Sequence, residues 1–253
     1  MTFTARNLPE GLQLNKTNGC ITGSVKQPGD YHVNLTVKNR KGRALIYFEP
    51  LVKAGAVGFS DDGDAVKTAE LMSEALENIK IFNLPIIDHC EDPNGGPPEG
   101  EARIVARDLE VAEKTKGWLH IAHVSTAGAV ELIRQAKKKG VRVTAEATPH
   151  HLLLTEEMIA KRGALAKVNP PLRTEADRQA LVEGIKDGTI DIIATDHAPH
   201  TEAEKERPYG DAPAGISGFE TAVGSLSAWS SNPTSLSNSR ARPGRSLKGY
   251  RLQ

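Results

Sequence analysis

The sequence is poor in the features that mark secreted, membrane-spanning or disulfide-stapled chains. Only two cysteines occur in 253 residues, Cys20 and Cys90, and their wide separation fits a reducing compartment better than a disulfide framework. No apolar stretch approaches the roughly 20 residues that a membrane span needs, and the start "MTFTARNLPEG" lacks the apolar region of a signal peptide. These absences predict a cytoplasmic protein with no membrane partner.

An excess of charge of either sign is also missing. Lys plus Arg and Asp plus Glu both number 32, so the whole chain gives no electrostatic reason to expect a nucleic-acid partner. The exception is local, because no acidic residue follows Glu220, whereas five basic residues do: Arg240, Arg242, Arg245, Lys248 and Arg251. Residues 230–253 are rich in Ser, Asn, Pro and Arg without an apolar period, which predicts a disordered basic tail or the remnant of a disrupted helix-and-strand segment.

The beginning of the chain has a β pattern. In "GDYHVNLTV" Tyr31, Val33, Leu35 and Val37 alternate with polar residues, and the turn signals "TNG" and "PGD" separate short strands. The stretch 8–43 resembles the Ig-like repeats of bacterial surface and glycan-handling proteins. A complete sandwich of that kind needs ~100 residues, so we expect residues 1–43 to form a short Ig-like β-ribbon fragment.

Strand-like and helix-like runs alternate over residues 44–229. The five strand-like runs are "AVGFSDD", "LPIIDHCED", "WLHIAHVST", "VRVTAEATPHHLLL" and "TIDIIATDHAPH". Helical segments are expected between them, in "KTAELMSEALENIKIF", "EARIVARDLEVAEKTK", "AGAVELIRQAKKKG" and "TEADRQALVEGIKDG". Strands that alternate with crossover helices are typical of a parallel sheet or a (β/α) barrel. The sequence therefore predicts an α/β fold, a partial TIM-type barrel of about five βα units.

Imidazole and carboxylate groups gather where the strand-like runs end. They are Asp61, Asp62, Asp88, His89, His123, His150, His151, Asp196, His197 and His200. The carboxyl ends of parallel strands face an open surface, so side chains there can meet. Nitrogen and oxygen ligands without thiolate suit a catalytic Zn²⁺ or a similar divalent ion with an open position for water. Such an ion lowers the pKa of bound water from about 15.7 to about 7 and polarises a carbonyl, as amide hydrolysis requires.

Seven motifs, taken in order, resemble those of the bacterial dihydroorotases of the amidohydrolase superfamily. They are "FSDDG", "IIDHCED", "HIAHVST", "VTAEATPHHLLLT", "KVNPPLR", "DGTIDIIATDHAPHT" and "GISGFETA". The resemblance extends from about residue 51 to residue 227. It implies a metal-dependent cyclic amidohydrolase that interconverts dihydroorotate and N-carbamoyl-L-aspartate in pyrimidine biosynthesis. It also implies one or two Zn²⁺ ions as cofactor, with Mn²⁺ as an alternative.

The resemblance assigns roles to individual positions. Four residues are the implied metal ligands: Asp62, His89, His123 and Asp196. Asp196 is also the implied catalytic residue, which takes a proton from the attacking water and returns it to the leaving nitrogen. Four others are the implied substrate contacts: Asn169, His200, Ala214 and Gly215.

Structural roles are expected for the other polar residues near the strand ends. His120 is expected to pack behind the sheet, and Cys90 to be a small buried residue. His150 and His151 are expected to hydrogen-bond a loop, and His197 to orient a neighbouring group. Asp61 is expected to cap a helix, and Asp88 to support a metal ligand from behind.

Two family features are missing from the motif set. Dihydroorotases open their barrel with a His-x-His pair on the first strand, followed by an Arg that grips the substrate carboxylate. His32 and Asn34 have the spacing of such a pair, but they lie in the Ig-like stretch, and we interpret the match as accidental. An eight-unit barrel takes about 250 residues, so the first half of the barrel is absent from the pattern. The remaining ligands serve mainly one metal, and the strongest contact with an anionic substrate is lost.

The sequence leaves four interpretations open. The first is an active dihydroorotase-type enzyme with a small-molecule substrate. The second is a non-catalytic dihydroorotase-like chain that supports a partner such as an aspartate transcarbamoylase, or associates as a homo-oligomer. The third makes the Ig-like ribbon a surface adhesion module, and the fourth is an inactive truncated fusion. An incomplete barrel exposes sheet edges and apolar faces, which favours partner binding or aggregation.

Overall fold

The computed structural model describes residues 2–6, 8–15, 21–23, 34–38, 45–61, 63–92 and 98–230. Several of the residues discussed above lie outside these ranges: Cys20, His32, Asp62 and the tail from residue 231 onward. In the first part of the chain, β1 (Thr2–Arg6) pairs antiparallel with β4 (Asn34–Lys38), and β2 (Leu12–Leu14) pairs antiparallel with β3 (Ile21–Gly23). The β pattern of the N-terminal stretch thus appears as two short ribbons.

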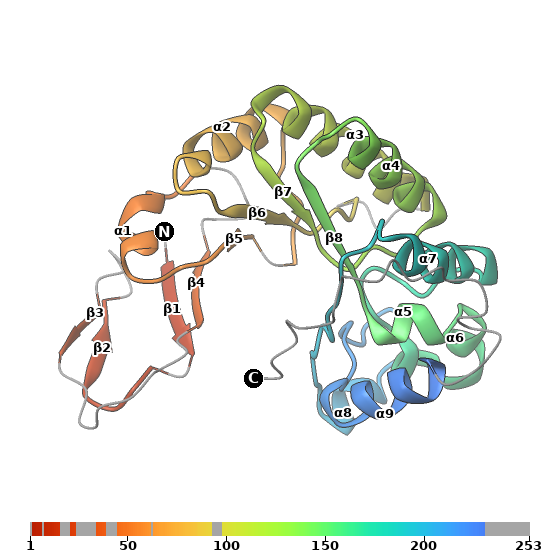
Figure 1. Cartoon of the computed structure of the whole chain (residues 1–253). Helices are drawn as coiled ribbons and strands as arrows, with labels where there is room; N and C mark the ends of the chain where they lie inside the picture. The colour runs from red at the N-terminus through yellow and green to blue at the C-terminus, as the bar shows by residue number, and fades with distance from the viewer. Residues whose placement is uncertain are drawn as a thin grey trace.

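A parallel sheet of five strands forms the body of the protein, in the order β5-β6-β7-β8-β9. The strands are β5 (Phe59–Ser60), β6 (Pro85–Asp88), β7 (Trp118–Ile121), β8 (Val143–Ala147) and β9 (Ile192–Ile193). Spatial order equals chain order, so each strand returns to its neighbour through a helical crossover. Figure 1 shows this sheet with α2, α3, α4 and α7 along its outer side. The predicted partial barrel of about five βα units is confirmed.

The long helices lie close to where the sequence predicts them. The helices are α1 (Phe48–Lys53), α2 (Ala69–Lys80), α3 (Pro98–Thr115), α4 (Ala127–Lys138), α5 (Pro149–Leu153), α6 (Glu157–Arg162), α7 (Glu175–Asp187), α8 (Glu202–Lys205) and α9 (Phe219–Ser230), with a 3₁₀ turn at Gly163–Ala166. No helix in the described part of the chain is both long and apolar enough to cross a membrane.

Threonine side chains cap the start of five of these helices, α2, α4, α5, α7 and α8. The hydroxyl of Thr68 accepts a hydrogen bond from the backbone N–H of Leu71 at the start of α2, and Thr126 does the same for Ala129 at the start of α4. Thr174 forms a full capping box at the start of α7. The expectation that Asp61 caps a helix is wrong for α2, since Thr68 holds the N-cap position and Asp61 lies seven residues earlier in the sequence.

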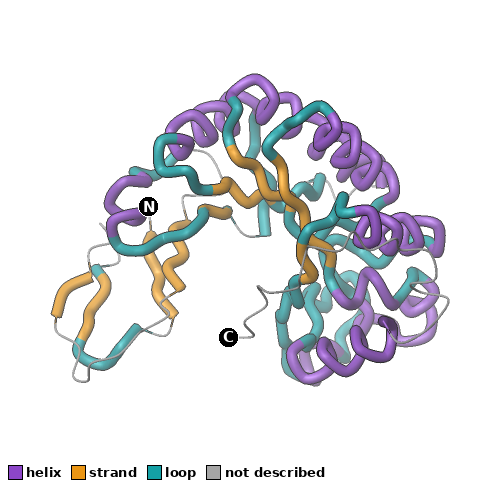
Figure 2. Tube along the Cα trace, in the orientation of Figure 1, coloured by secondary structure: helices purple, strands orange, loops and turns teal. Residues whose placement is uncertain are grey.

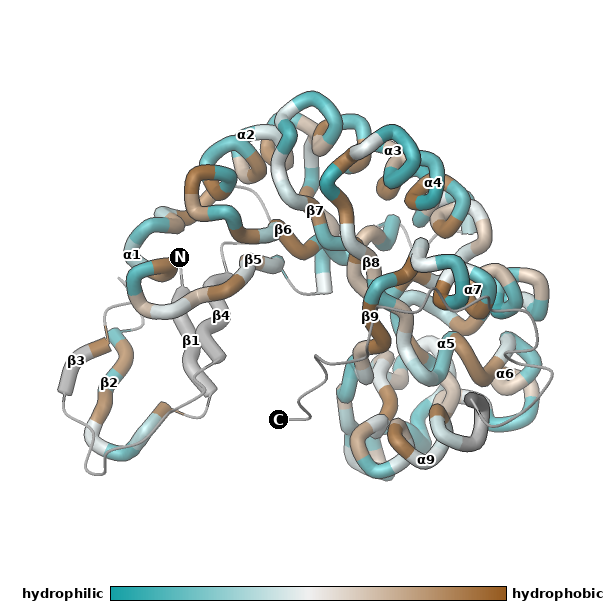
Figure 3. Tube along the Cα trace, in the orientation of Figure 1, coloured by the Kyte–Doolittle hydropathy of each residue, from teal (hydrophilic) through white to brown (hydrophobic). Residues whose placement is uncertain are grey.

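The core fills the space between the helices and one face of the sheet. Alternate strand residues point to this face and are buried there: Ile86, Leu119, Ile121, Val143, Ala145 and Ala147. Helix residues such as Met72, Val105 and Ile133 complete the core. In Figure 3 the outer sides of α3 and α4 are coloured teal, which marks hydrophilic residues. Their sides toward the sheet contain the apolar residues, coloured brown.

The opposite face of the sheet carries polar side chains, and His120 is one of them. Its Nδ1 lies 2.8 Å from Oγ1 of Thr144, and its Nε2 lies 3.2 Å from a carboxylate oxygen of Glu146, both on the next strand. The expectation that His120 packs behind the sheet is wrong. Leu119 and Ile121 occupy the helix-covered face, so the residue between them must point the other way.

The sheet is open at both sides within the described residues. β5 and β9 are its outer strands, and each pairs with one neighbour only. Figure 2 shows the strands tracing an arc that does not close. Apolar side chains lie exposed at both edges, Val57 just before β5 and Ile192 in β9. Such edges are templates for pairing with another strand.

Candidate metal and substrate site

Two of the predicted metal ligands lie side by side. His89 follows β6 and His123 follows β7, and the two rings meet edge to face with centroids 4.2 Å apart. Both side chains are buried. Because β6 and β7 are neighbouring parallel strands, their carboxyl ends bring the two imidazoles to the same place. We call this pair the imidazole pair.

The environment of His123 fits a divalent metal. Its Nδ1 is buried and has no hydrogen-bond partner among the residues that the structure describes. Burial, and then the neighbouring His89, hold the pKa of His123 well below its ordinary value, so the ring is neutral at pH 7. A neutral imidazole nitrogen left unsatisfied in the interior is costly, and a zinc or manganese ion would satisfy it.

The backbone at His123 and at Asp196 is in the left-handed region. The φ angles are 34° and 46°, values that residues other than glycine seldom adopt. Backbone strain of this kind is often found at functional sites. The two predicted ligands at the ends of β7 and β9 share this feature.

Asp196 is separated from the imidazole pair by one strand. β8 lies between β7 and β9, which puts the two backbones about 10 Å apart. Within the described ranges, no group of ligand atoms within 4.8 Å of one another contains His89, His123 and Asp196. Asp62 lies outside the described residues. The four-ligand set therefore stays a prediction, of which the structure brings together only His89 and His123.

A cavity of about 220 Å³ opens beside His89. Its lining residues are Gly63, Asp64, Ala65, His89, Glu91, Asp92 and Asn169. They come from the loop after β5, the end of β6 and the loop before α7. Asn169, a predicted substrate contact, thus shares one cavity with His89, a predicted metal ligand.

The other three predicted substrate contacts lie together. Nε2 of His200 is 2.9 Å from the carbonyl oxygen of Ala214. At Gly215 the φ angle is 139°, and an added Cβ would stand 2.5 Å from the carbonyl oxygen of Ala198, so only glycine fits. The N–H of Gly215 donates to the carbonyl of Lys167, two residues before Asn169. The loops that carry these contacts are therefore bonded to each other.

Lys205 holds these loops in place, although no sequence motif points to it. Its ammonium group donates to the carbonyls of Lys167, Pro213 and Gly215 at 3.2, 3.1 and 2.8 Å. The residue is 8% exposed, and burial lowers its pKa. In "TEAEKERPYG" Lys205 stands among charged residues that look like a solvated helix face, so the sequence has no signal for this role.

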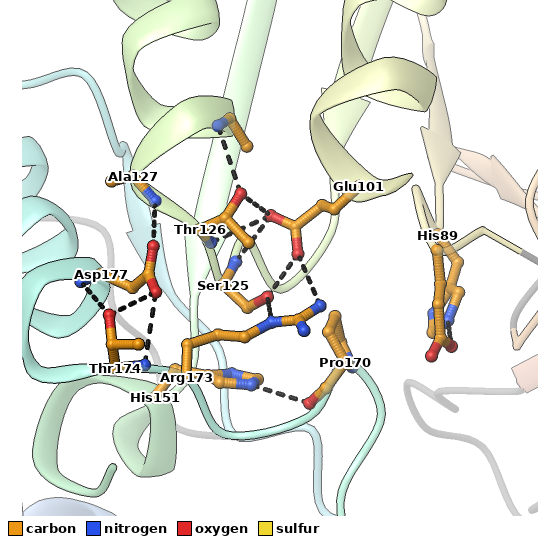
Figure 4. A network of polar contacts seen from close by, with 12 residues as sticks. His89, Glu101, Ser125, Thr126, Ala127, His151, Pro170, Arg173, Thr174 and Asp177 are labelled. Atoms are coloured by element: carbon orange, nitrogen blue, oxygen red, sulfur yellow. Dashed lines mark hydrogen bonds and ion pairs between the residues drawn. The ribbon is translucent and has the colours of Figure 1, made fainter. Parts of the chain in front are cut away.

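Glu101 is the centre of a second buried network, shown in Figure 4. Its carboxylate accepts hydrogen bonds from the backbone N–H groups of Ser125 and Thr126 at 3.0 and 3.1 Å, and from both hydroxyls. Nε of Arg173 donates to Oγ of Ser125 at 3.2 Å, and Nη2 of Arg173 lies 3.9 Å from Glu101. The network links the first turn of α3, the N-terminus of α4 and the loop that carries Asn169.

His151 is hydrogen-bonded to the loop that carries Asn169. Its Nε2 lies 2.9 Å from the carbonyl oxygen of Pro170, and its Nδ1 lies 2.8 Å from Oγ1 of Thr148. Since a carbonyl only accepts, Nε2 is the donor and Nδ1 accepts from the hydroxyl. Burial lowers the pKa of His151 to about 3. The expected bond to a loop is confirmed for His151, whereas Nε2 of His150 is buried without a partner in the described part of the chain.

His197 has the expected orienting role. Its Nδ1 accepts hydrogen bonds from the backbone N–H groups of Gly218 and Phe219 at 3.0 and 3.2 Å, where α9 begins. Its ring stacks on Phe219 with centroids 4.0 Å apart. The side chain therefore joins the end of β9 to α9.

A third polar group lies on the helix side of β6. Ligand atoms of Asp88, Cys90 and Asp108 lie within 4.8 Å of one another, the one such group of three in the described ranges. Burial, and then Asp108, raise the pKa of Asp88 well above its ordinary value, and burial raises that of the Cys90 thiol. Both shifts favour the protonated forms, which are poor metal ligands. We interpret this group as structural: Cys90 is buried as expected, and Asp88 accepts from the N–H of Val66 rather than supporting a histidine.

The fold is similar to that of a class of solved structures, the hydantoinases and dihydropyrimidinases. Among solved structures, a D-hydantoinase matches with a TM-score of 0.65 and 21% identity, over 70% of this chain and 47% of that chain. The dihydropyrimidinase from Brevibacillus agri NCHU1002 matches with a TM-score of 0.65 and 22% identity, over 71% of this chain and 46% of that chain. The L-hydantoinase from Arthrobacter aurescens matches with a TM-score of 0.64 and 26% identity, over 71% and 47%.

Curated relatives narrow this class and confirm the resemblance drawn from the motifs. The dihydroorotase of Pelotomaculum thermopropionicum is 45% identical over 232 residues, covering 82% of this chain and 54% of the relative. That of Acetivibrio thermocellus is 47% identical over 225 residues, covering 80% and 53%. That of Endomicrobium trichonymphae is 41% identical over 245 residues, covering 83% and 58%. The chain spans little more than half the length of these dihydroorotases.

The N-terminal resemblance is confirmed as well. Residues 1–52 match a family model described as "Putative Ig domain". This match includes both β-ribbons and most of α1. The bounds of the separate domains stay a prediction.

Proposed function

We propose that this chain is a metal-dependent cyclic amidohydrolase of dihydroorotase type, which interconverts dihydroorotate and N-carbamoyl-L-aspartate in pyrimidine biosynthesis. The observation that supports this most is the imidazole pair, His89 and His123, at the ends of neighbouring strands. The cavity that contains both His89 and Asn169 gives a small molecule room next to this pair. The likeness to dihydroorotases supplies the reaction.

In this proposal His89 and His123 would hold a metal ion, with Asp196 and Asp62 as carboxylate ligands. When bound, Zn²⁺ or Mn²⁺ would make water acidic enough to be a nucleophile at neutral pH and would polarise the amide carbonyl. The buried, unsatisfied Nδ1 of His123 is the observation that supports a metal at this place.

The protein's own groups carry the remaining steps. Asp196 takes the proton from the attacking water and gives it to the ring nitrogen that leaves. Asn169, His200, Ala214 and Gly215 hold the pyrimidine ring. The backbone of Ala214 and Gly215 fixes the orientation of the ring. Preorganised contacts of this kind lower the barrier because they are already in place when the reaction begins.

The anionic substrate needs a cation that the described cavity does not supply. Among the described residues that line it, three are carboxylates and none is Lys or Arg. We propose that the active form is an assembly in which an added subunit covers the open sheet edges at β5 and β9, as a homo-oligomer or with an aspartate transcarbamoylase. The same acidic lining favours the second candidate, a non-catalytic dihydroorotase-like partner chain.

A dihydroorotate hydrolysis assay with added Zn²⁺ tests the proposal, run beside the variant Asp196→Ala. Turnover by the wild type well above that of the variant supports the enzyme. Equal, background-level rates from both proteins, with zinc bound, support the non-catalytic partner. A chain that binds neither zinc nor manganese after dialysis contradicts both the metal and the reaction.

A further inference from the structure

Glu91, which none of the assigned roles uses, lies against the imidazole pair. Its carboxylate oxygen Oε2 is 3.0 Å from Nε2 of His89. The side chain of His89 is 7% exposed and that of Glu91 is 18% exposed, so water competes little for this contact. A backbone hydrogen bond of 2.8 Å from the N–H of Glu91 to the carbonyl of His89 folds the chain into a tight turn. The turn brings the carboxylate back over the ring.

The contact selects one tautomer of His89. A carboxylate can only accept a hydrogen bond, so the proton between the two groups belongs to Nε2 of the ring. In a neutral imidazole the other nitrogen, Nδ1, then has a free lone pair. Of the two nitrogens of His89, Nδ1 is therefore the one left for a metal.

The other carboxylates of the cavity have cations as partners. Asp64 lies 3.1 Å from the ammonium group of Lys67, and Asp92 is bonded to Arg103. Glu91 instead faces an imidazole whose ring touches His123. A carboxylate that orients a metal-binding histidine commonly stands in this place in metal centres.

We propose that Glu91 is a positioning residue of the metal centre: it holds the proton of His89 on Nε2 and presents Nδ1 to the metal. The part of this inference that concerns the metal rests on the proposed function. The part that concerns the tautomer does not, because it follows from the contact in the metal-free chain.

The tautomer is measured first, on the full chain with ¹⁵N-labelled histidine. Long-range ¹H–¹⁵N NMR spectra at pH 7.5 distinguish a protonated from an unprotonated ring nitrogen, and the variant His89→Asn assigns the signals. We expect the wild-type ring to carry its proton on Nε2, and Glu91→Ala to give a mixture of both tautomers. A wild-type ring protonated on Nδ1, or a ring that Glu91→Ala leaves unchanged, overturns the proposal.

Zinc affinity is measured next, by competition with a chromophoric chelator. We expect Glu91→Ala to weaken zinc binding about 10- to 100-fold, and Glu91→Gln, which keeps the size and an acceptor oxygen, to weaken it less. Glu113→Ala removes one negative charge from the exposed side of α3 and is expected to change affinity less than threefold. If Glu91→Ala does not fold, Glu91→Gln and the wild-type tautomer decide the matter.

The two measurements separate this proposal from the proposed function. A wild type that binds zinc, with Glu91→Ala binding it as tightly as Glu113→Ala does, rejects the role of Glu91 and leaves the enzyme proposal standing. A wild type that binds no zinc rejects the metal centre. The tautomer spectra then still confirm or reject the contact between Glu91 and His89.

Discussion

The two halves of the candidate site are held in different ways. The imidazole pair is positioned by neighbouring strands, whose register puts His89 and His123 at the same end of the sheet. The substrate half, which comprises Asn169, His200, Ala214 and Gly215, lies on loops. Those loops depend on buried polar anchors, Lys205 and Glu101, because loop backbone has no sheet ladder to fix it. The metal half therefore depends on topology, and the substrate half depends on a few side chains.

Loss of Asp196 should have the largest effect, because Asp196 is proposed to act in the reaction itself. Asp196→Ala removes the proposed proton shuttle, and we expect turnover of dihydroorotate to fall at least ~100-fold. The imidazole pair is unchanged, so part of the zinc binding should remain. Steady-state kinetics together with zinc content by mass spectrometry checks this. An Asp196→Ala protein with near-wild-type turnover would exclude Asp196 as the shuttle.

Removal of Glu101 should test the buried anchor of the Asn169 loop. Glu101→Ala leaves the donors of Ser125 and Thr126 unsatisfied and Arg173 without its carboxylate, so we expect a loss of about 3 kcal/mol in the free energy of unfolding. Urea denaturation followed by circular dichroism measures it. As a control, Glu110→Ala removes an exposed carboxylate of the same helix and should cost less than about 1 kcal/mol. Equal losses for both variants would contradict the anchoring role.

Acid should weaken the same loop through His151. Its pKa is about 3 in the folded chain and near 6.5 when exposed, so the unfolded chain binds more protons between these pH values. The contribution of His151 is complete above pH 6.5 and is lost as the pH falls toward 3. We expect this effect of His151 to lower the free energy of unfolding by about 2 kcal/mol between pH 7.5 and pH 5. Urea midpoints of the wild type and of His151→Gln at both pH values isolate it, and parallel losses in the two proteins would refute it.

The smallest expected effect concerns Lys205. Lys205→Met removes three hydrogen bonds to carbonyls of the substrate loops, and we expect KM for dihydroorotate to rise about 10-fold. Zinc affinity should change less than twofold, because the hydrogen bonds of Lys205 go to these loops and not to the imidazole pair. Lys205→Arg, which retains the charge and donors, should restore part of the affinity for substrate. A variant that loses zinc instead of substrate would show that the two halves are not independent.

Much of the fold could be predicted because its signals are local. The helix expected in "AGAVELIRQAKKKG" begins at Ala127 as predicted, and the strand expected in "WLHIAHVST" begins at Trp118. Apolar periodicity decides such elements within a few residues of chain. The imidazole pair follows from the same reasoning, since polar residues after neighbouring parallel strands must meet at one end of the sheet.

The errors have physical reasons that can be named. The expectation that His120 lies behind the sheet fails because the alternation of Leu119 and Ile121 places it on the opposite face. The expectation that Asp61 caps a helix fails because Thr68 stands directly before the first helical turn of α2. Both signals are local: strand parity for His120, and the residue directly before the first helical turn for α2.

The order of strands and helices, the pairing of His89 with His123 and the likeness to dihydroorotases all follow from short patterns in the sequence. The roles of Glu101 and Lys205, and the role proposed for Glu91, arise only in the folded chain. A charged side chain looks the same in the sequence whether water or protein surrounds it. Its role is decided when distant carbonyls, hydroxyls or imidazoles close around it in the folded chain.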